Sequence, residues 1–511
     1  MMDRRYLSPV VTVFIATLAS ACMPPVAAAP IATGSSASAP SDRPPALSAI
    51  DTAQLRRDLY TMASDAMRGR EAGTLDELRA SAWVADRARE AGLQPAGDDG
   101  TYFQFWPMHR LLTADNSHAE LDGAPLELWK DAAVVTPVDA TLDLPLVWVG
   151  TASNDSLTHL DLRGRAVAAM TLPPSRPPVS WISLRMWRYT RQEIAERTAA
   201  LRKTGALAII LVADDSTRDQ FIPVSVPMRR GSYPVDTSSI ARIRKQVPVL
   251  WLTASQESRV ENARRVSLDL RAESFDYPSV NVVAKVPGTD PRMRDEYVLF
   301  SGHDDHDGVR FPVAGDSIWN GADDNASVAV GMLAIGRAFV AHPAHRSALF
   351  VWHGAEERGL LGSRWFVSHP TVPLTSIVAV LNGDMIGRNN PDSAALLGSQ
   401  PPHRNSAALV NMALDANNRV TKFIIDSTWD RPTHPEGWYF RSDHLPYARA
   451  DVPALFFTTL LHPDYHTPAD EASKIDYGKL ARVDQWMYAT GWEVANAAAS
   501  PAVDSGFKLE R

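Results

Sequence analysis

The chain has 511 residues, which is more than one compact core usually accommodates and predicts roughly two to three structural units. Hydrophobic residues make up 45% of the chain and charged residues 22%, as in an ordinary globular protein with a sizeable core. The formal net charge is -8 and the sequence contains no long basic run, so the composition argues against a nucleic acid as partner.

The N-terminus has the features of a targeting segment. Arg4 and Arg5 precede an apolar run over residues 10–21 that is too short to cross a bilayer comfortably. Small residues lead to Cys22, in a pattern that resembles a bacterial lipoprotein processing site, whereas Ala27 to Ala29 suit an ordinary signal peptidase. We therefore expect a signal peptide at 1–29, cut either after residue 29 or before a lipid-bearing Cys22. The mature protein would then be exported: periplasmic or anchored to the outer membrane, or else secreted.

Cys22 is the only cysteine of the chain, so an exported fold must be held together by its core or by metal rather than by an intrachain disulfide. After the signal segment, residues 30–47 are rich in Ser, Ala and Pro without periodic apolar positions, which is typical of a flexible linker. The sequence contains no second apolar run long enough to cross a membrane.

The next elements alternate between helix and strand patterns. Residues 51–92 are predicted to be helical and residues 102–106 to form a strand. The region 133–270 contains short apolar runs but no convincing catalytic cluster. From residue 281 onward, strand and helix patterns alternate, and four runs are apolar throughout, as in strands buried on both faces of a sheet. These runs are residues 297–300, 348–352, 377–381 and 454–458.

Polar clusters follow these buried strands, where an open α/β sheet has its ligand crevice. Each cluster has an unremarkable explanation on its own: a structural histidine, helix capping, solvated glutamates or a turn. Together they offer imidazoles and carboxylates of the kind that bind zinc. The clusters are Ser301 to His306, Asn320 to Ser327, His353 to Ser363, Leu381 to Gly387 and Leu461 to Asp470.

The five clusters, in this order, are similar to those of the dinuclear zinc aminopeptidase family, which includes bacterial leucyl aminopeptidases and, more distantly, glutamate carboxypeptidase II and the transferrin receptor. Arg70 to Thr74 and Ser442 to Tyr447 match the same pattern. The resemblance covers a catalytic domain in two parts, 48–115 and 276–498. It implies a zinc exopeptidase fold of the α/β class, with a mixed, mainly parallel sheet sandwiched by helices. Residues 133–270 resemble a smaller, β-rich protease-associated domain inserted into it, and 499–511 form a C-terminal tail.

Carried over position by position, the resemblance implies two zinc ions per chain and a role for each residue. His303 and Asp384 would bind one ion, Glu357 and His466 the other, and Asp324 would bridge them. Adjacent Glu356 would be the general base, and Asp305 would orient His303. His462 is the substitute if His466 is not a ligand. The resemblance gives no direct metal bond to Asp323, His306 or His444, and Asp304, where relatives carry an aromatic or apolar residue, is expected to turn outward.

The function that this resemblance implies is removal of N-terminal residues from peptides by an activated water, with Glu356 as base. A carboxypeptidase or dipeptidase on the same fold is an alternative, with Arg388 and Arg441 as candidate partners of a substrate carboxylate. A single-zinc glutaminyl cyclase and a non-enzymatic, receptor-like protein fit less well, because all six central positions are present. Trp438 to Phe440 could line an apolar pocket or belong to the core.

Overall fold

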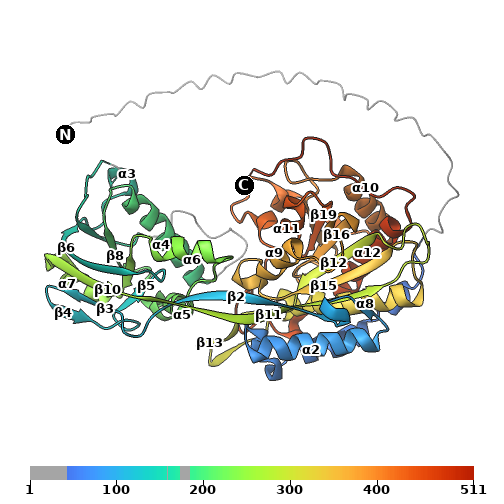
Figure 1. Cartoon of the computed structure of the whole chain (residues 1–511), viewed down its shortest axis with the longest axis horizontal. Helices are drawn as coiled ribbons and strands as arrows, with labels where there is room; N and C mark the ends of the chain where they lie inside the picture. The colour runs from blue at the N-terminus through green and yellow to red at the C-terminus, as the bar shows by residue number, and fades with distance from the viewer. Residues whose placement is uncertain (1–42, 158, 173–184, 511) are drawn as a thin grey trace, which may run out of the picture. The chain divides into compact units, whose positions relative to one another are not determined.

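The computed structural model describes residues 43–157, 159–172 and 185–510 (Figure 1). The predicted signal segment, Cys22 and the linker up to residue 42 lie outside these residues. Within the described part of the chain, no helix combines the length and apolar character needed to cross a bilayer. Two large sheets organise these residues, and both belong to one compact unit.

The larger sheet has nine strands and carries the predicted metal ligands. Its order is β1-β11-β15-β12-β16-β19-β17-β18, with β2 added on β11. The pairs β12–β15, β12–β16 and β16–β19 are parallel, whereas β11 and β17 pair antiparallel with their neighbours β15 and β19. The strands are β1 (Gln94–Pro95), β2 (Phe103–Thr113), β11 (Ala272–Val286), β12 (Tyr297–His303), β15 (Ser347–His353), β16 (Ile377–Gly383), β17 (Ser393–Leu397), β18 (Ile424–Ile425) and β19 (Ala454–Thr458).

Helices cover both faces of this sheet because its central strands are apolar on both sides. Val298 and Phe300 of β12 pack into a core shared with α1, α2, α8, α10 and α12, whereas Leu299 packs on the opposite side with α9 and α11. The predicted fold class, a mixed sheet between helices, is therefore confirmed. The helices are α1 (Thr52–Met62), α2 (Leu75–Glu90), α8 (Ser327–Ala341), α9 (Leu361–Ser368), α10 (Ala407–Ala416), α11 (His444–Arg449) and α12 (Tyr477–Asn496).

The continuous helix predicted over residues 51–92 is instead two helices, α1 and α2. The chain between them takes positive φ angles at Arg68, Gly69, Arg70 and Gly73, which a helix cannot contain. Thr74 then restarts the chain as a helix, because its side chain accepts a hydrogen bond from the backbone N–H of Asp76 at 3.1 Å.

The second sheet has eight strands in the order β4-β3-β10-β6-β7-β8-β9-β5. The run β6-β7-β8-β9 is parallel, and helices pack on it, so this part is an α/β layer rather than only β-rich. Its strands are β3 (His118–Leu121), β4 (Ala124–Leu126), β5 (Ala132–Val134), β6 (Ala140–Trp148), β7 (Ala166–Met170), β8 (Ala208–Val212), β9 (Val249–Leu252) and β10 (Arg265–Leu270). Its helices are α3 (Asn154–Leu157), α4 (Met186–Arg202), α5 (Phe221–Arg230), α6 (Thr237–Arg244) and α7 (Glu257–Asn262).

The second sheet includes residues ahead of 133, where the sequence predicts the inserted domain to begin. β3 lies ahead of that boundary and pairs with β10, so residues 118–121 complete the second sheet. The long strands β2 and β11 connect the two sheets, because β11 continues from β10 into the larger sheet while paired with β2 from Thr113 to Phe103.

Candidate metal centre

The parallel strands bring four polar loops to one edge of the larger sheet. β12 ends at His303, β15 leads into Glu356 and Glu357, β16 leads into Asp384, and the chain after β19 reaches His466. Asp324 lies in the turn that precedes α8. Side chains separated by up to 163 positions in the sequence meet there, as expected for the crevice of an open α/β sheet.

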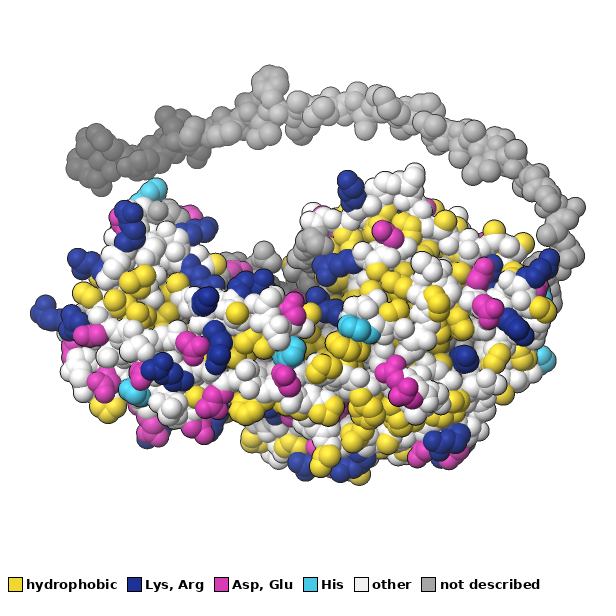
Figure 2. Space-filling view, in the orientation of Figure 1, with side chains coloured by type: hydrophobic (Ala, Val, Ile, Leu, Met, Phe, Trp, Pro, Cys, Tyr) yellow, Lys and Arg dark blue, Asp and Glu magenta, His cyan; other side chains and the backbone are white. Residues whose placement is uncertain are grey.

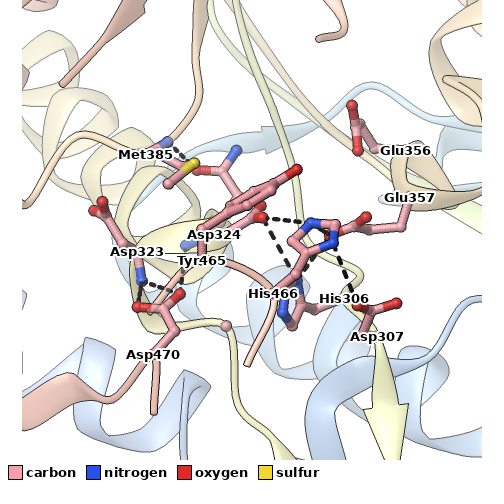
Figure 3. Close-up of polar contacts among 12 residues, drawn as sticks. His306, Asp307, Asp323, Asp324, Glu356, Glu357, Met385, Tyr465, His466 and Asp470 are labelled. Atoms are coloured by element: carbon pink, nitrogen blue, oxygen red, sulfur yellow. Dashed lines mark hydrogen bonds and ion pairs between the residues drawn. The ribbon is translucent and has the colours of Figure 1, made fainter. Parts of the chain in front are cut away.

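The ligand-type atoms fall into two groups. In each group, atoms of the imidazoles and carboxylates all lie within 4.8 Å of one another. The first group consists of His303, Glu356 and Asp384; the second consists of His306, Asp324, Glu357 and His466. Figure 3 shows the second group, with dashed lines from the imidazole of His466 to Asp324 and Glu357.

Asp324 lies between the two groups. One of its oxygens, Oδ1, lies 3.3 Å from Nε2 of His303, and the other, Oδ2, lies 3.0 Å from Nε2 of His466. Burial opposes ionisation of Asp324, but its contacts with these two imidazoles outweigh that effect and keep its pKa below the ordinary value. This geometry suits a carboxylate that bridges two cations.

A second carboxylate holds the backbone at Asp324 in place. Asp470 accepts hydrogen bonds from the N–H groups of Asp323, at 3.0 Å, and Asp324, at 3.1 Å. The side chain of Asp323 in turn accepts a hydrogen bond from the N–H of Gly387 at 2.6 Å. Asp323 thus supports the loops rather than joining either group.

Glu356 and Glu357 point to different groups, as their predicted roles require. They form a single 3-10 turn with Arg358 after β15. The carboxylate of Glu357 lies 3.1 Å from Nε2 of His466 (Figure 3), whereas that of Glu356 lies 3.9 Å from Nε2 of His303. Burial raises the pKa of Glu356 well above its usual value, and nearby Glu357 and Asp384 add to the increase.

Asp305 connects the first imidazole to Glu356. Its carboxylate accepts a hydrogen bond from the backbone N–H of Glu356 at 2.9 Å, and lies 3.6 Å from Nδ1 of His303. The same ring nitrogen is 3.1 Å from the backbone oxygen of Asp305. Asp305 is therefore placed to position both side chains at once.

Asp304 does not turn outward, although the sequence predicted that it would. Its side chain is fully buried and accepts a hydrogen bond from Ser81 of α2 at 2.8 Å, away from both groups. Burial raises the pKa of Asp304 to about 7. The prediction failed because α2 and the turn before it cover this strand end, and Arg70 there donates a hydrogen bond to the Asp304 carbonyl at 2.8 Å.

His306 is the site residue that sequence reasoning left aside. It is fully buried, with Nδ1 2.9 Å from Oε1 of Glu357, and it packs edge-on against His466. The available signal was its position three residues after His303 at the same strand end. His462, the substitute ligand, lies elsewhere, 3.5 Å from Asp323. His444 is a core residue between Tyr439 and Phe456.

The donor set fits metal ions. Nε2 of His306 is buried without a hydrogen-bond partner, and Nε2 of His303 and Oε1 of Glu357 face only other ionisable groups of the site. This is a costly arrangement that a bound cation relieves. Imidazole and carboxylate are the ligands that zinc takes in catalytic sites. A cavity of about 290 Å³ opens onto these groups, lined by Glu356, Asp384 and His466 as well as by Trp438 and Phe440.

Comparison with known proteins finds a family that this part of the chain resembles. The model of Peptidase family M28 matches residues 281–490. "Probable leucine aminopeptidase" of Trichophyton verrucosum is 25% identical over 258 residues, or 48% of this chain and 66% of that protein. "Leucine aminopeptidase 2" of Trichophyton rubrum is 27% identical over 178 residues, or 34% of this chain and 32% of that protein. The match thus spans just under two thirds of the length of the first relative and about a third of the second.

Solved structures share the fold. An aminopeptidase from Aneurinibacillus sp. strain AM-1 aligns with a TM-score of 0.55 and 17% identity over 88% of this chain and 95% of its own. A zinc aminopeptidase from Bacillus subtilis aligns with the same TM-score and identity over 90% of this chain and 99% of its own. The family resemblance predicted from the five clusters is confirmed, because the model of Peptidase family M28 matches residues 281–490, which contain all five of them.

Proposed function

We propose that this chain is a zinc-dependent aminopeptidase that binds two ions. The observation that carries the proposal is the position of Asp324, which offers one oxygen to each of two imidazole and carboxylate groups. The names of the fungal relatives and of the Bacillus subtilis structure support the same activity and metal. His303 and Asp384 would hold one ion, Glu357 and His466 the other, with Asp324 shared between them.

The side chains divide the work of hydrolysis. Bound zinc supplies Lewis acidity to the scissile carbonyl and to the attacking water. Glu356 is proposed to accept a proton from that water and to pass it to the leaving amine, which its burial and raised pKa favour. Asp305 positions Glu356 and His303 relative to each other. Its carboxylate lies 2.9 Å from the backbone nitrogen of Glu356 and 3.6 Å from Nδ1 of His303.

The test combines activity with metal content. We expect the mature protein to release N-terminal residues from free peptides but not from N-acetylated ones, and to contain two zinc ions per chain by elemental analysis. Glu356→Gln should retain both ions and lose at least about a hundredfold in kcat. Glu261→Gln, an exposed change on α7, is the matched control. Zinc bound without any turnover by the wild type would refute the proposal.

A carboxypeptidase or dipeptidase is the second candidate, and one observation favours it. Of the two arginines considered from the sequence, Arg441 lines the cavity at the metal centre, whereas Arg388 is paired with Asp464 at 2.8 Å. Release of C-terminal residues from N-acetylated peptides would move the assignment to a carboxypeptidase.

We also propose that the chain is exported, with a signal segment removed after residue 29 or before a lipid-bearing Cys22. The basis is the sequence pattern of the first 29 residues. Mass spectrometry of the mature N-terminus from cells of a bacterial host distinguishes the two cuts, because only the second leaves an acylated cysteine. An uncut N-terminus would contradict export by either route.

A further inference from the structure

A second cavity beside the metal centre is lined by arginines. It has a volume of about 360 Å³, and its walls include Arg185, Arg188 and Arg191, all close to the start of α4, together with Arg441, Tyr465 and His466. Among the residues that the structure describes, no aspartate or glutamate lines it. On the face shown in Figure 2, by contrast, Lys and Arg side chains are interspersed with Asp and Glu. We call this cavity the arginine pocket.

The positive charge of the arginine pocket is incompletely balanced. Arg188 and Arg441 share one carboxylate, Glu436, which lies 3.1 Å from Nη1 of Arg441. Arg191 makes no ion pair or hydrogen bond from its guanidinium to any residue that the structure describes. Burial lowers the pKa of Arg191, and the positive charge of Arg310 lowers it further, against the attraction of Asp307.

In the neighbouring cavity, the arginines are paired with carboxylates of the protein. Arg230 contacts Glu71 at 3.0 Å, Arg310 contacts Asp307, and Arg358 lies 3.4 Å from Asp307. These three line an adjoining cavity that also contains Asp307 and Glu357 and shares Arg191 and His466 with the arginine pocket. Ion pairing within the protein therefore accounts for them, but it does not account for the arginine pocket.

Two contacts hold Arg441 in a fixed orientation. Its guanidinium donates a hydrogen bond to the hydroxyl of Tyr465 at 2.8 Å and stacks over Trp438 with its central carbon 4.5 Å from the ring centroid. A guanidinium held in this way loses little freedom on binding, and its planar fork matches a carboxylate.

The arginine pocket opens directly beside the metal centre. His466, one of the proposed ligands, lines both cavities, and so do Tyr465 and Arg441. If the scissile bond of a peptide lies at His466, a side chain or terminus about one residue from that bond can therefore reach the arginine pocket.

We propose that the arginine pocket binds a carboxylate of the peptide substrate, so that the enzyme selects substrates with a negative charge close to the scissile bond. This inference rests on the proposed peptidase function. Two sources supply the same chemistry: the terminal carboxylate of a very short peptide, and the side chain of an aspartate or glutamate next to the cleaved bond.

The experiment compares matched substrates on wild-type, zinc-loaded protein. One pair differs at the C-terminus, Leu-Gly-Gly against its amide. The other pair differs in a side chain, Leu-Glu-Gly-amide against Leu-Gln-Gly-amide. We expect kcat/KM to be about tenfold or more higher for the charged member of one pair, the size of one charge-assisted hydrogen bond. The pair that responds identifies the source of the carboxylate.

Arginine variants then locate the effect. In Arg191→Ala the charged-to-uncharged ratio of kcat/KM should fall towards one, and Arg191→Lys should restore part of it. Arg202→Ala, at the other end of α4 and outside all three cavities, is the matched control and should keep the wild-type ratio. A ratio below twofold for both pairs, or a ratio that Arg191→Ala leaves intact, would overturn the proposal.

Failure of the peptidase function itself looks different. Hydrolysis of uncharged leucine p-nitroanilide reports that function without using the arginine pocket. Calorimetric titration with glutarate, compared between the wild type and Arg191→Ala, reports the pocket without turnover. If glutarate binds and the binding requires Arg191, but the protein has no peptidase activity, only the proposed function is contradicted. If the protein has peptidase activity but glutarate does not bind in this way, only the proposal for the arginine pocket is contradicted.

Discussion

Buried imidazoles and carboxylates at the ends of the central strands are the feature from which the proposed chemistry follows. His303, Asp324 and Glu357 have little or no contact with water, yet each has atoms directed at another ionisable group. Such groups are expensive to bury unless they pair or bind metal. The position of Asp324 between the two groups is the observation that supports the proposal of two ions.

His306 provides a prediction at the same scale. Its Nδ1 lies 2.9 Å from Glu357, inside the second group, so we expect it to bind or orient that site. His306→Asn should weaken binding of one of the two ions by about 10- to 100-fold, as loss of supporting ligands does elsewhere. Chelator competition, with cobalt absorption as the readout, measures this. His118→Asn, on an exposed strand, is the control, and equal affinities in both variants would leave His306 a structural residue only.

Helix α12 packs closely on β12. A Cβ added to Gly491 would lie 2.2 Å from Cζ of Phe300, which is buried beneath it. Gly491→Ala should therefore destabilise the protein by about 1–3 kcal/mol despite the better helix propensity of alanine. Urea unfolding measures the change. Gly478→Ala, in the first turn of the same helix, has its nearest neighbour at 3.3 Å and should be neutral or slightly stabilising. If Gly491→Ala instead stabilised the protein, the prediction would be wrong, because α12 would then be able to move away from Phe300 and make room for the methyl group.

Helix α4 carries a pH-sensitive element away from the metals. Burial raises the pKa of Glu193 to about 7, and Glu196 adds to the increase. The folded state therefore binds this proton more tightly than the unfolded state, and stability falls as pH rises from about 4.5 to about 7. Glu193→Gln should raise the melting temperature at pH 8.5 but change it little at pH 4. Glu261→Gln, an exposed change on α7, is the control, and a gain that does not depend on pH would contradict this explanation.

The whole molecule should depend on its metals for stability. Without cations, the buried carboxylates of Asp324, Glu357 and Asp384 repel one another, and ions that bind only the folded state stabilise it by about 4 kcal/mol when their free concentration is 1,000 times Kd. We expect a chelator to lower the melting temperature and added zinc to restore it. Asp324→Ala, which lacks the shared ligand, should show a smaller shift. A melting temperature that is unchanged by the chelator would argue against two ions that stabilise the fold.

Local patterns were sufficient for the class of fold and for the residues that bring the family's chemistry. Continuous apolar runs such as 297–300 mark buried parallel strands from a few adjacent residues, and the polar residues that follow them must lie at the sheet edge. The clusters that contain His303, Glu356, Glu357, Asp384 and His466 could be located in this way, because strand and loop alternate over short stretches of chain. The expected role of each residue came from the resemblance to the family.

Contacts between distant segments decided the rest. Asp304 is turned inward by Ser81 of α2, His306 is joined to Glu357 from another strand end, and β3 pairs with β10 across the insertion. The arginine pocket combines the start of α4 with Arg441, roughly 250 residues later, and no pattern of either segment contains the other. Packing of whole elements sets which of many charged side chains face one another, so only the tertiary structure could separate ligand, support and pocket.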